Sequence, residues 1–510
     1  MKRTVTFFVL FLSVGAYLSA EKTLYIPGAL GNVNNDANQW SLSRSRQSAN
    51  FVVFWEAGYG DNPDGKKVEP NGKYTVDVNK VLALAEQSFD YYADTLKFIE
   101  RGNSLTDLYK MIIRLRYTDE WEATGSGMDD KIGLLTLTAW SASALGVTVA
   151  HEVGHCFQYQ VHCDGFPGGY MHGIGGSSGN VFWEMCAQWM ALRVLPQNKF
   201  SERLSEYYSN EHLNPMHESP RYANHFIQNY WTYKHGDDII ARLWQQSVSP
   251  EDPIETYKRL TGITQEEFND EMYDLAARFV TWDIPELIDL GKTHVVDRGI
   301  PKLNAVEDGY FQIDTSKCIQ NYGHNIIRLN PPAKATTIVA CVDGLLGKAT
   351  NDYRSVKAQY NGWRFGFVVH RPDGTRLYSP VHALHTSVAS AIPKDTLYFE
   401  CPAGGRVFFV ISGAPTEHWQ HAWDDNYSND EQWGYRVKFY NTNVYGKTNN
   451  ELDLALPSVA VAVATDDLYV RDIYGRTIYH GTDNNAWRRR VPTGIYLITQ
   501  GGKTTKEWIQ

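Results

Sequence analysis

The spacing of apolar residues changes near residue 296, and this change most constrains the fold. Helical spacing dominates from about residue 147 to 290 and ends near the breakers Pro285 and Gly291. Beyond residue 296, short runs rich in β-branched and aromatic residues alternate with Gly, Pro, Asn and Asp, for example at 364–370 and 407–411. That texture predicts a β-sandwich over 296–447.

The segments on either side of this region complete the expected organisation. Residues 51–55, 111–117 and 132–139 are predicted strands, and 78–99 carries helical periodicity. Residues 21–295 are therefore expected to form one mixed domain, and residues 448–510 a small C-terminal β-sandwich. The predicted fold class is α+β.

The first 20 residues have the layout of a secretory signal peptide. Lys2 and Arg3 precede an apolar stretch at 7–18, and Ser19-Ala20 offers a small-residue cleavage site. The stretch is shorter than the roughly 18 to 20 apolar residues of a membrane span. We therefore expect a secreted or cell-surface protein with no transmembrane segment.

Composition excludes some classes of protein. With 43% hydrophobic and 21% charged residues, the chain is typical of folded proteins rather than disordered ones. A net charge of −10 argues against nucleic acid as a partner. Six cysteines in 510 residues do not form a disulfide scaffold, and their pairing stays open.

The segment 148–158 contains the pattern His-Glu-x-x-His at His151, Glu152 and His155. On a helix, the two histidines are one turn apart and project from the same face, so both can reach one zinc ion. Glu152 lies beside them as a candidate general base for a zinc-activated water. The pattern predicts one catalytic zinc ion.

A catalytic zinc site needs a third protein ligand, for which Glu184 is the candidate. It lies in a strongly apolar helical segment at 181–191, where an unpaired carboxylate would be costly to bury. A zinc ion would compensate this charge. An Arg or Lys partner is the alternative.

His151, Glu152 and His155 followed by Glu184 resemble the gluzincin branch of zinc metallopeptidases. The resemblance implies that 132–139 is the edge strand that aligns the substrate chain. Gln158 is similar to a position in enhancin-like peptidases that attack mucins. Gln188 stands where many gluzincins carry an Asp that orients the first histidine, and it gives less charge support.

A wider resemblance covers roughly residues 22–440. The segments 51–56, 148–158, 181–191, 412–419 and 430–433 together resemble an uncharacterised family of large secreted bacterial proteins. The tail, through 468–476, 491–498 and 503–509, resembles a sorting domain of the type nine secretion route; a generic β-sandwich tail is the alternative.

Gluzincins place a Tyr or His on a later helix to stabilise the oxyanion. Tyr222 is the first candidate for this role, with His225 and Tyr230 as alternatives; packing or surface exposure is the common role for any one of them. The Gly-rich stretch 165–179 is expected to be a connector that could fold over the cleft and contribute Tyr170 or His172.

Acidic and aromatic residues gather at 418–433. His418, His421, Asp424, Asp425, Asp430 and Glu431 lie among Trp419, Trp423 and Trp433. A calcium ion bound by the carboxylates, or a glycan stacked on the tryptophans, are the sharper interpretations. An acidic loop anchored by aromatic side chains is the plainer one, and we favour it.

Together these features predict a secreted zinc metallopeptidase. Its expected substrate is an extracellular protein or glycoprotein, with glycan contact through the β-domains. Two other functions stay open: hydrolysis of a non-peptide ester or amide by the same zinc, and a surface glycan- or protein-binding role with an inactive or structural zinc domain.

Overall fold

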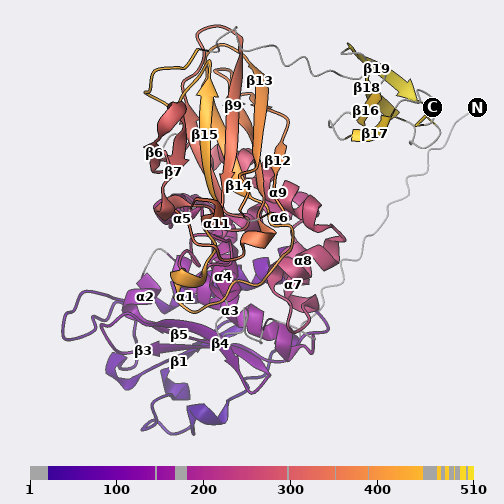
Figure 1. Ribbon diagram of the computed structural model, residues 1–510. Coiled ribbons are helices and arrows are strands. Elements are labelled where there is room, and N and C mark those ends of the chain that lie inside the picture. The colour runs from indigo at the N-terminus through magenta and orange to yellow at the C-terminus, as the bar shows by residue number, and fades with distance from the viewer. Residues whose placement is uncertain are drawn as a thin grey trace, which may run out of the picture.

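The computed structural model is an α+β protein in which helices lie between a lower mixed sheet and an upper pair of packed sheets (Figure 1). The predicted fold class is confirmed at this level. The structure describes residues 21–143, 146–166, 170, 181–295, 298–350, 352–388, 390–451, 468–472, 477–481, 487–488, 494–500 and 503–509. The predicted signal peptide lies outside these residues.

The first sheet has the order β1-β2-β3-β5-β4. The three central strands β2 (Phe51–Trp55), β3 (Met111–Arg116) and β5 (Ile132–Thr138) are parallel, and β1 (Ser45–Gln47) and β4 (Ala123–Met128) are antiparallel edges. The central strands confirm the predicted ones. Residues 51, 53 and 55 of β2 face the helices, and residues 52 and 54 face the N-terminal segment, so both faces are covered and the strand is apolar throughout.

The edge strand is β4, so the expectation that 132–139 forms the edge is wrong. β5 pairs with β3 on one side and β4 on the other. β4 consists mainly of Ala, Thr, Gly and Ser because it packs closely against a helix. An added Cβ at Gly125 would clash with the carbonyl oxygen of Glu152 and lie 2.8 Å from the Cβ of His155.

Helices α1 (Val78–Asp90) and α3 (Val147–Cys163) share one apolar core with this sheet. The single helix predicted over 78–99 ends at Asp90 and continues as a π-helical turn at Tyr91–Thr95. Helix α4 (Val181–Val194) crosses α3 at Gly154, where an added Cβ would lie 3.2 Å from the Cα of Ala187. This close approach places Glu184 opposite the two histidines of α3.

Helix α2 (Ala139–Ser143) lies between β5 and α3 in the chain. The helices between α4 and the upper sheets are α5 (Leu204–Asn210), α6 (Phe226–His235), α7 (Ile239–Gln246), α8 (Pro253–Thr261), α9 (Gln265–Phe279) and α10 (Ile288–Gly291). Tyr273, Ala276 and Ala277 of α9 pack on Ile326, Val368 and Val410 of the upper unit. One apolar face of α9 thus docks the β unit onto the helices.

The upper unit consists of two sheets that share one apolar core. One has the order β11-β10-β14-β8 with β12 also on β10, and the other has the order β13-β9-β15-β7-β6. The strands are β6 (Leu303–Ala305), β7 (Phe311–Ile313), β8 (His324–Leu329), β9 (Thr336–Leu345), β10 (Trp363–His370), β11 (Arg376–Tyr378), β12 (His382–Leu384), β13 (Lys394–Cys401), β14 (Arg406–Gly413) and β15 (Gly434–Tyr440), with helix α11 (Gly347–Thr350) after β9. We call this pair of sheets the sandwich.

The tail forms a separate four-stranded antiparallel sheet in the order β17-β16-β18-β19. Its strands are β16 (Leu468–Asp472), β17 (Thr477–Gly481), β18 (Gly494–Gln500) and β19 (Lys503–Ile509). Among the described helices, none is both long and apolar enough to cross a membrane.

Candidate metal centre

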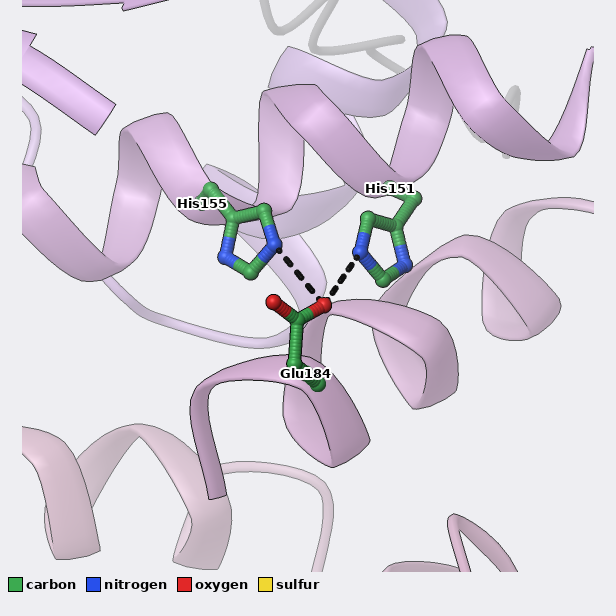
Figure 2. A group of neighbouring side chains, drawn as sticks. All are labelled: His151, His155 and Glu184. Atoms are coloured by element: carbon green, nitrogen blue, oxygen red, sulfur yellow. Dashed lines mark hydrogen bonds and ion pairs between the residues drawn. The ribbon is translucent and has the colours of Figure 1, made fainter. Parts of the chain in front are cut away.

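His151, His155 and Glu184 come together where α3 crosses α4 (Figure 2). The Oε2 atom of Glu184 lies 3.2 Å from Nε2 of His151 and 3.5 Å from Nε2 of His155. Tetrahedral ligands about 2.0–2.1 Å from a zinc ion are separated from one another by about 3.3 Å. The two distances from Glu184 are close to this value, and the ligand atoms of all three residues lie within 4.8 Å of one another, as one bound ion would require.

Two glutamine side chains fix the orientation of these imidazoles. Oε1 of Gln158 lies 2.8 Å from Nδ1 of His155, and Nε2 of the same amide donates to the carbonyl of Trp183. Oε1 of Gln188 lies 3.2 Å from Nδ1 of His151. An amide oxygen accepts a hydrogen bond, so each neutral imidazole carries its proton on Nδ1.

The consequence is a clash of acceptors at the centre of the cluster. Both Nε2 atoms then present lone pairs to a carboxylate oxygen, which also only accepts. Such an arrangement needs a proton or a cation between the acceptors. Gln188 stands at the position where many gluzincins carry an Asp. It contacts His151, as a residue that orients a metal ligand would.

The electrostatics of the cluster agree with this geometry. Burial raises the pKa of Glu184, but the contacts with the His151 and His155 imidazoles, with a positive charge between the acceptors, outweigh burial and hold the pKa well below its usual range. Burial lowers the pKa of His155, but contacts with Glu184 and Glu152 outweigh burial and raise it. The cluster therefore holds a carboxylate anion and attracts positive charge.

Glu152 lies within α3 between the two histidines and is 5% exposed. Burial raises its pKa, the two imidazoles lower it, and Glu184 raises it, with a net increase. The groups that perturb Glu152 are thus the three residues of the cluster. A carboxyl with a raised pKa next to the cluster is suited to accept and return a proton.

Of the three oxyanion candidates, Tyr222 lies beside the cluster. Its ring centroid is 5.9 Å from that of His151, and burial together with Glu184 raises the pKa of its hydroxyl. His225 is fully buried and stacks on Phe226, and the Tyr230 hydroxyl donates to Asp274. The structure therefore brings Tyr222 to the site and directs the other two elsewhere.

Two arginines beside Tyr222 were not anticipated. The guanidinium carbons of Arg203 and Arg221 lie 5.2 and 5.3 Å from the Tyr222 ring centroid. The Arg221 guanidinium also lies 5.3 Å from the Trp423 ring, which belongs to the loop between β14 and β15. Only the folded chain brings Trp423 to Arg221, because 202 positions separate them in the sequence.

The cysteines near the motif are not part of the cluster. All six cysteines are free thiols. The Sγ atom of Cys186 accepts a hydrogen bond from the Trp244 indole, and Cys156 packs beside Gly133 of β5. In the connector, the Tyr170 carbonyl accepts a hydrogen bond from the Trp183 indole, while His172 lies outside the described residues.

The acidic and aromatic residues at 418–433 divide between the interior and the surface. Trp433 is fully buried and cannot stack on a glycan, whereas Trp419 and Trp423 are half-buried. Asp424 accepts hydrogen bonds from Asn426 and Asn429 at the exposed tip, and Asp430 is turned inward. Calcium binding in this loop stays a prediction.

The chain matches a protein family and is similar to solved structures. The model of a family described as "Family of unknown function (DUF6055)" matches residues 16–446. A comparison with curated proteins finds no match. Among solved structures, the chain is similar to a family GH115 4-O-methyl-α-glucuronidase with specificity for decorated arabinogalactans, at 9% identity and a TM-score of 0.14. The match spans 59% of this chain and 43% of that enzyme, and a TM-score this low carries no argument.

Proposed function

We propose that this chain, which belongs to the family of unknown function DUF6055, is a secreted zinc-dependent metallopeptidase. The observation that carries the proposal is the spacing of 3.2 and 3.5 Å between Glu184 Oε2 and the two histidine Nε2 atoms. Two imidazoles and one carboxylate are the protein ligands of many catalytic zinc sites, which keep a fourth position open.

The proposed reaction assigns one role to each residue at the site. A bound zinc ion supplies Lewis acidity, which polarises a carbonyl group and acidifies a water molecule. Glu152 accepts the proton of the attacking water and returns it to the leaving amine. The Tyr222 hydroxyl donates a hydrogen bond to the oxyanion. Gln158 and Gln188 hold the ligand imidazoles in the required tautomer.

The surrounding fold supports a zincin-like assignment of residues 21–295. An antiparallel edge strand, β4, packs against the helix that carries the two histidines. One side of β4 pairs with β5, and its other side is at the edge of the sheet. An extended peptide can pair with such an edge through main-chain hydrogen bonds. We infer that β4, rather than β5, aligns the substrate.

The proposal extends to substrate and location. We propose an extracellular protein or glycoprotein as substrate, with glycan contact through the sandwich and the tail sheet aiding export to the surface or medium. The alternative of a binding protein with an inactive zinc domain accounts less well for Glu152, because a structural zinc site needs no base.

The test combines zinc content with turnover. Purified wild type should hold zinc that Glu184→Ala loses, and should cleave a protein or glycoprotein substrate in an unbiased panel. Glu152→Gln should keep its zinc and lose about 100- to 10,000-fold in kcat/KM. Glu100→Gln, at an exposed position away from the site, is the matched control and should retain activity.

Two outcomes would count against the proposal. Wild type that binds no zinc at His151, His155 and Glu184 would eliminate the site. Zinc-loaded protein whose activity is the same in wild type and Glu152→Gln would show that the hydrolysis comes from elsewhere.

A further inference from the structure

A second group of histidines and carboxylates lies at the junction between the helices and the sandwich. His217 belongs to the segment between α5 and α6, and His421 and Asp430 belong to the loop between β14 and β15. One potential ligand atom from each lies within 4.8 Å of the others. Their exposed fractions are 0%, 7% and 6%, so the group is part of the interior.

The distances in this group match those of the first cluster. Nε2 of His217 lies 3.4 Å from Oδ2 of Asp430, and Nε2 of His421 lies 3.2 Å from Oδ1 of the same carboxylate. The two imidazole centroids are 4.7 Å apart. Again the spacing is close to the edge of about 3.3 Å between tetrahedral zinc ligands.

Three polar atoms in or beside the group are buried without a hydrogen-bond partner. They are Nε2 of His217, Nε2 of His421 and Oε2 of Glu218, which directly follows His217 in the chain. An unpaired buried polar atom costs about 1–3 kcal/mol, so three at one point favour a cation that pairs with them. Nδ1 of His421 lies 2.8 Å from the Ala422 carbonyl, which fixes the proton on Nδ1. The lone pair of its Nε2 then faces Asp430.

His217 needs one proton shift to bind a cation in the same way. The Ser219 amide donates to its Nδ1 at 3.0 Å, which places the proton of a neutral ring on Nε2. Oε2 of Glu218 lies 3.3 Å from the same Nδ1 and is one of the unpaired atoms. If the proton moves to Nδ1, the Ser219 amide loses this acceptor, but the Nδ1–H group can donate a hydrogen bond to Glu218. The ring then has the carboxylate support typical of metal-ligating histidines.

A neighbouring histidine shows what a fully paired group at this junction looks like. His418 contacts Asp252 at 3.0 Å through Nε2 and the Tyr322 hydroxyl at 2.9 Å through Nδ1. Asp252 also caps α8, and Glu255 completes that capping box. Every side chain of this group has a partner within the protein, so it requires no ion.

We propose that His217, His421 and Asp430 bind a second divalent metal ion that joins the helical part of the chain to the sandwich. Imidazole ligands favour zinc over calcium, which takes oxygen ligands. The ion would cross-link segments 204 positions apart, between His217 and His421. Arg221 and Tyr222 follow His217 in the chain, and Trp423 follows His421. We call these three residues the rim, and the ion would hold them beside the first cluster.

The decisive measurement is the zinc content of a chain whose first site has been removed. We expect two zinc ions per chain in wild type after loading with Zn²⁺ and gel filtration, and one in His155→Ala/Glu184→Ala. Adding Asp430→Asn to that double variant should remove the remaining ion, and adding His418→Asn, the matched control, should not. Circular dichroism and gel filtration establish that each variant is folded.

Two results would overturn the proposal. The first is a folded His155→Ala/Glu184→Ala chain without zinc, and the second is a remaining zinc ion that is unaffected by Asp430→Asn. If Asp430→Asn does not fold, chelation of His155→Ala/Glu184→Ala decides. A lower unfolding temperature in EDTA supports the second metal ion, and an unchanged unfolding temperature refutes it. Wild type that holds one ion, lost in Asp430→Asn but kept in His155→Ala/Glu184→Ala, would refute the peptidase site and support this one.

Discussion

Replacing Gln158 by Ala should weaken zinc binding without disturbing any ligand. Gln158 is fully buried, accepts from Nδ1 of His155 at 2.8 Å and donates to the Trp183 carbonyl at 2.9 Å. Its removal leaves both partners unpaired in the interior and frees the imidazole to take the wrong tautomer. Loss of such an orienting contact weakens metal affinity about 10- to 100-fold, which equals about 1.4–2.7 kcal/mol.

Replacing Gln188 by Ala should have a smaller effect than replacing Gln158. The contact between Gln188 and His151 is longer, at 3.2 Å, so Gln188→Ala should fall nearer the lower end of that range. Zinc affinity is measured by competition with a chromophoric chelator. Gln160→Ala is the matched control, because Gln160 is equally buried in α3 but donates to Asp164. A folded Gln158→Ala chain with a zinc affinity within about twofold of the control would refute the tautomer argument.

Two further predictions concern the frame of the site. Gly125→Val should force β4 away from α3, destabilise the fold by about 1–3 kcal/mol and reduce activity. Gly28→Ala is the control and should have none of these effects, because an added Cβ there meets nothing within 4 Å. Equal denaturant midpoints for the two variants would contradict this prediction. Burial lowers the pKa of His225 in the folded chain to about 3. Below the pKa of about 6.5 that a histidine has in the unfolded chain, the unfolded chain therefore binds more protons than the folded chain. Stability should then drop by about 2 kcal/mol between pH 7 and pH 5 through this residue alone, and His225→Asn should remove that part of the pH dependence in urea unfolding; an unchanged slope would contradict it.

The central strands and the main helices could be predicted because each has a local pattern. β2 is a continuous apolar run, and α4 is an apolar segment long enough for a helix. β4 escaped prediction because its glycines and serine are typical of turns. The reason for those residues is the close approach of α3, which is a tertiary contact that local spacing does not record.

The grouping of His151, His155 and Glu184 could be predicted for the same kind of reason. His151 and His155 are one helical turn apart, and a carboxylate within an apolar helix marked Glu184 as a group in need of a cation. The second cluster has no such signal, because His217 and Asp430 are 213 positions apart. Their proximity depends on how α9 docks the sandwich, and the sequence pattern carries no information on that docking.

The position of Arg221 connects the two clusters and indicates why the sandwich matters to the proposed active site. Its guanidinium lies over Tyr222, beside the first cluster, and over Trp423, in the loop that supplies two residues to the second. Gln320 makes further polar contacts between the helical part and the sandwich. Its side chain accepts a hydrogen bond from the backbone N–H of Asn214 and donates one to Asp430. A change in the position of the sandwich would therefore move Trp423 and Arg221, and with them the environment of the Tyr222 hydroxyl. The rim of the proposed active site is thus built from both parts of the chain, and residues 21–295 alone would lack one side of it.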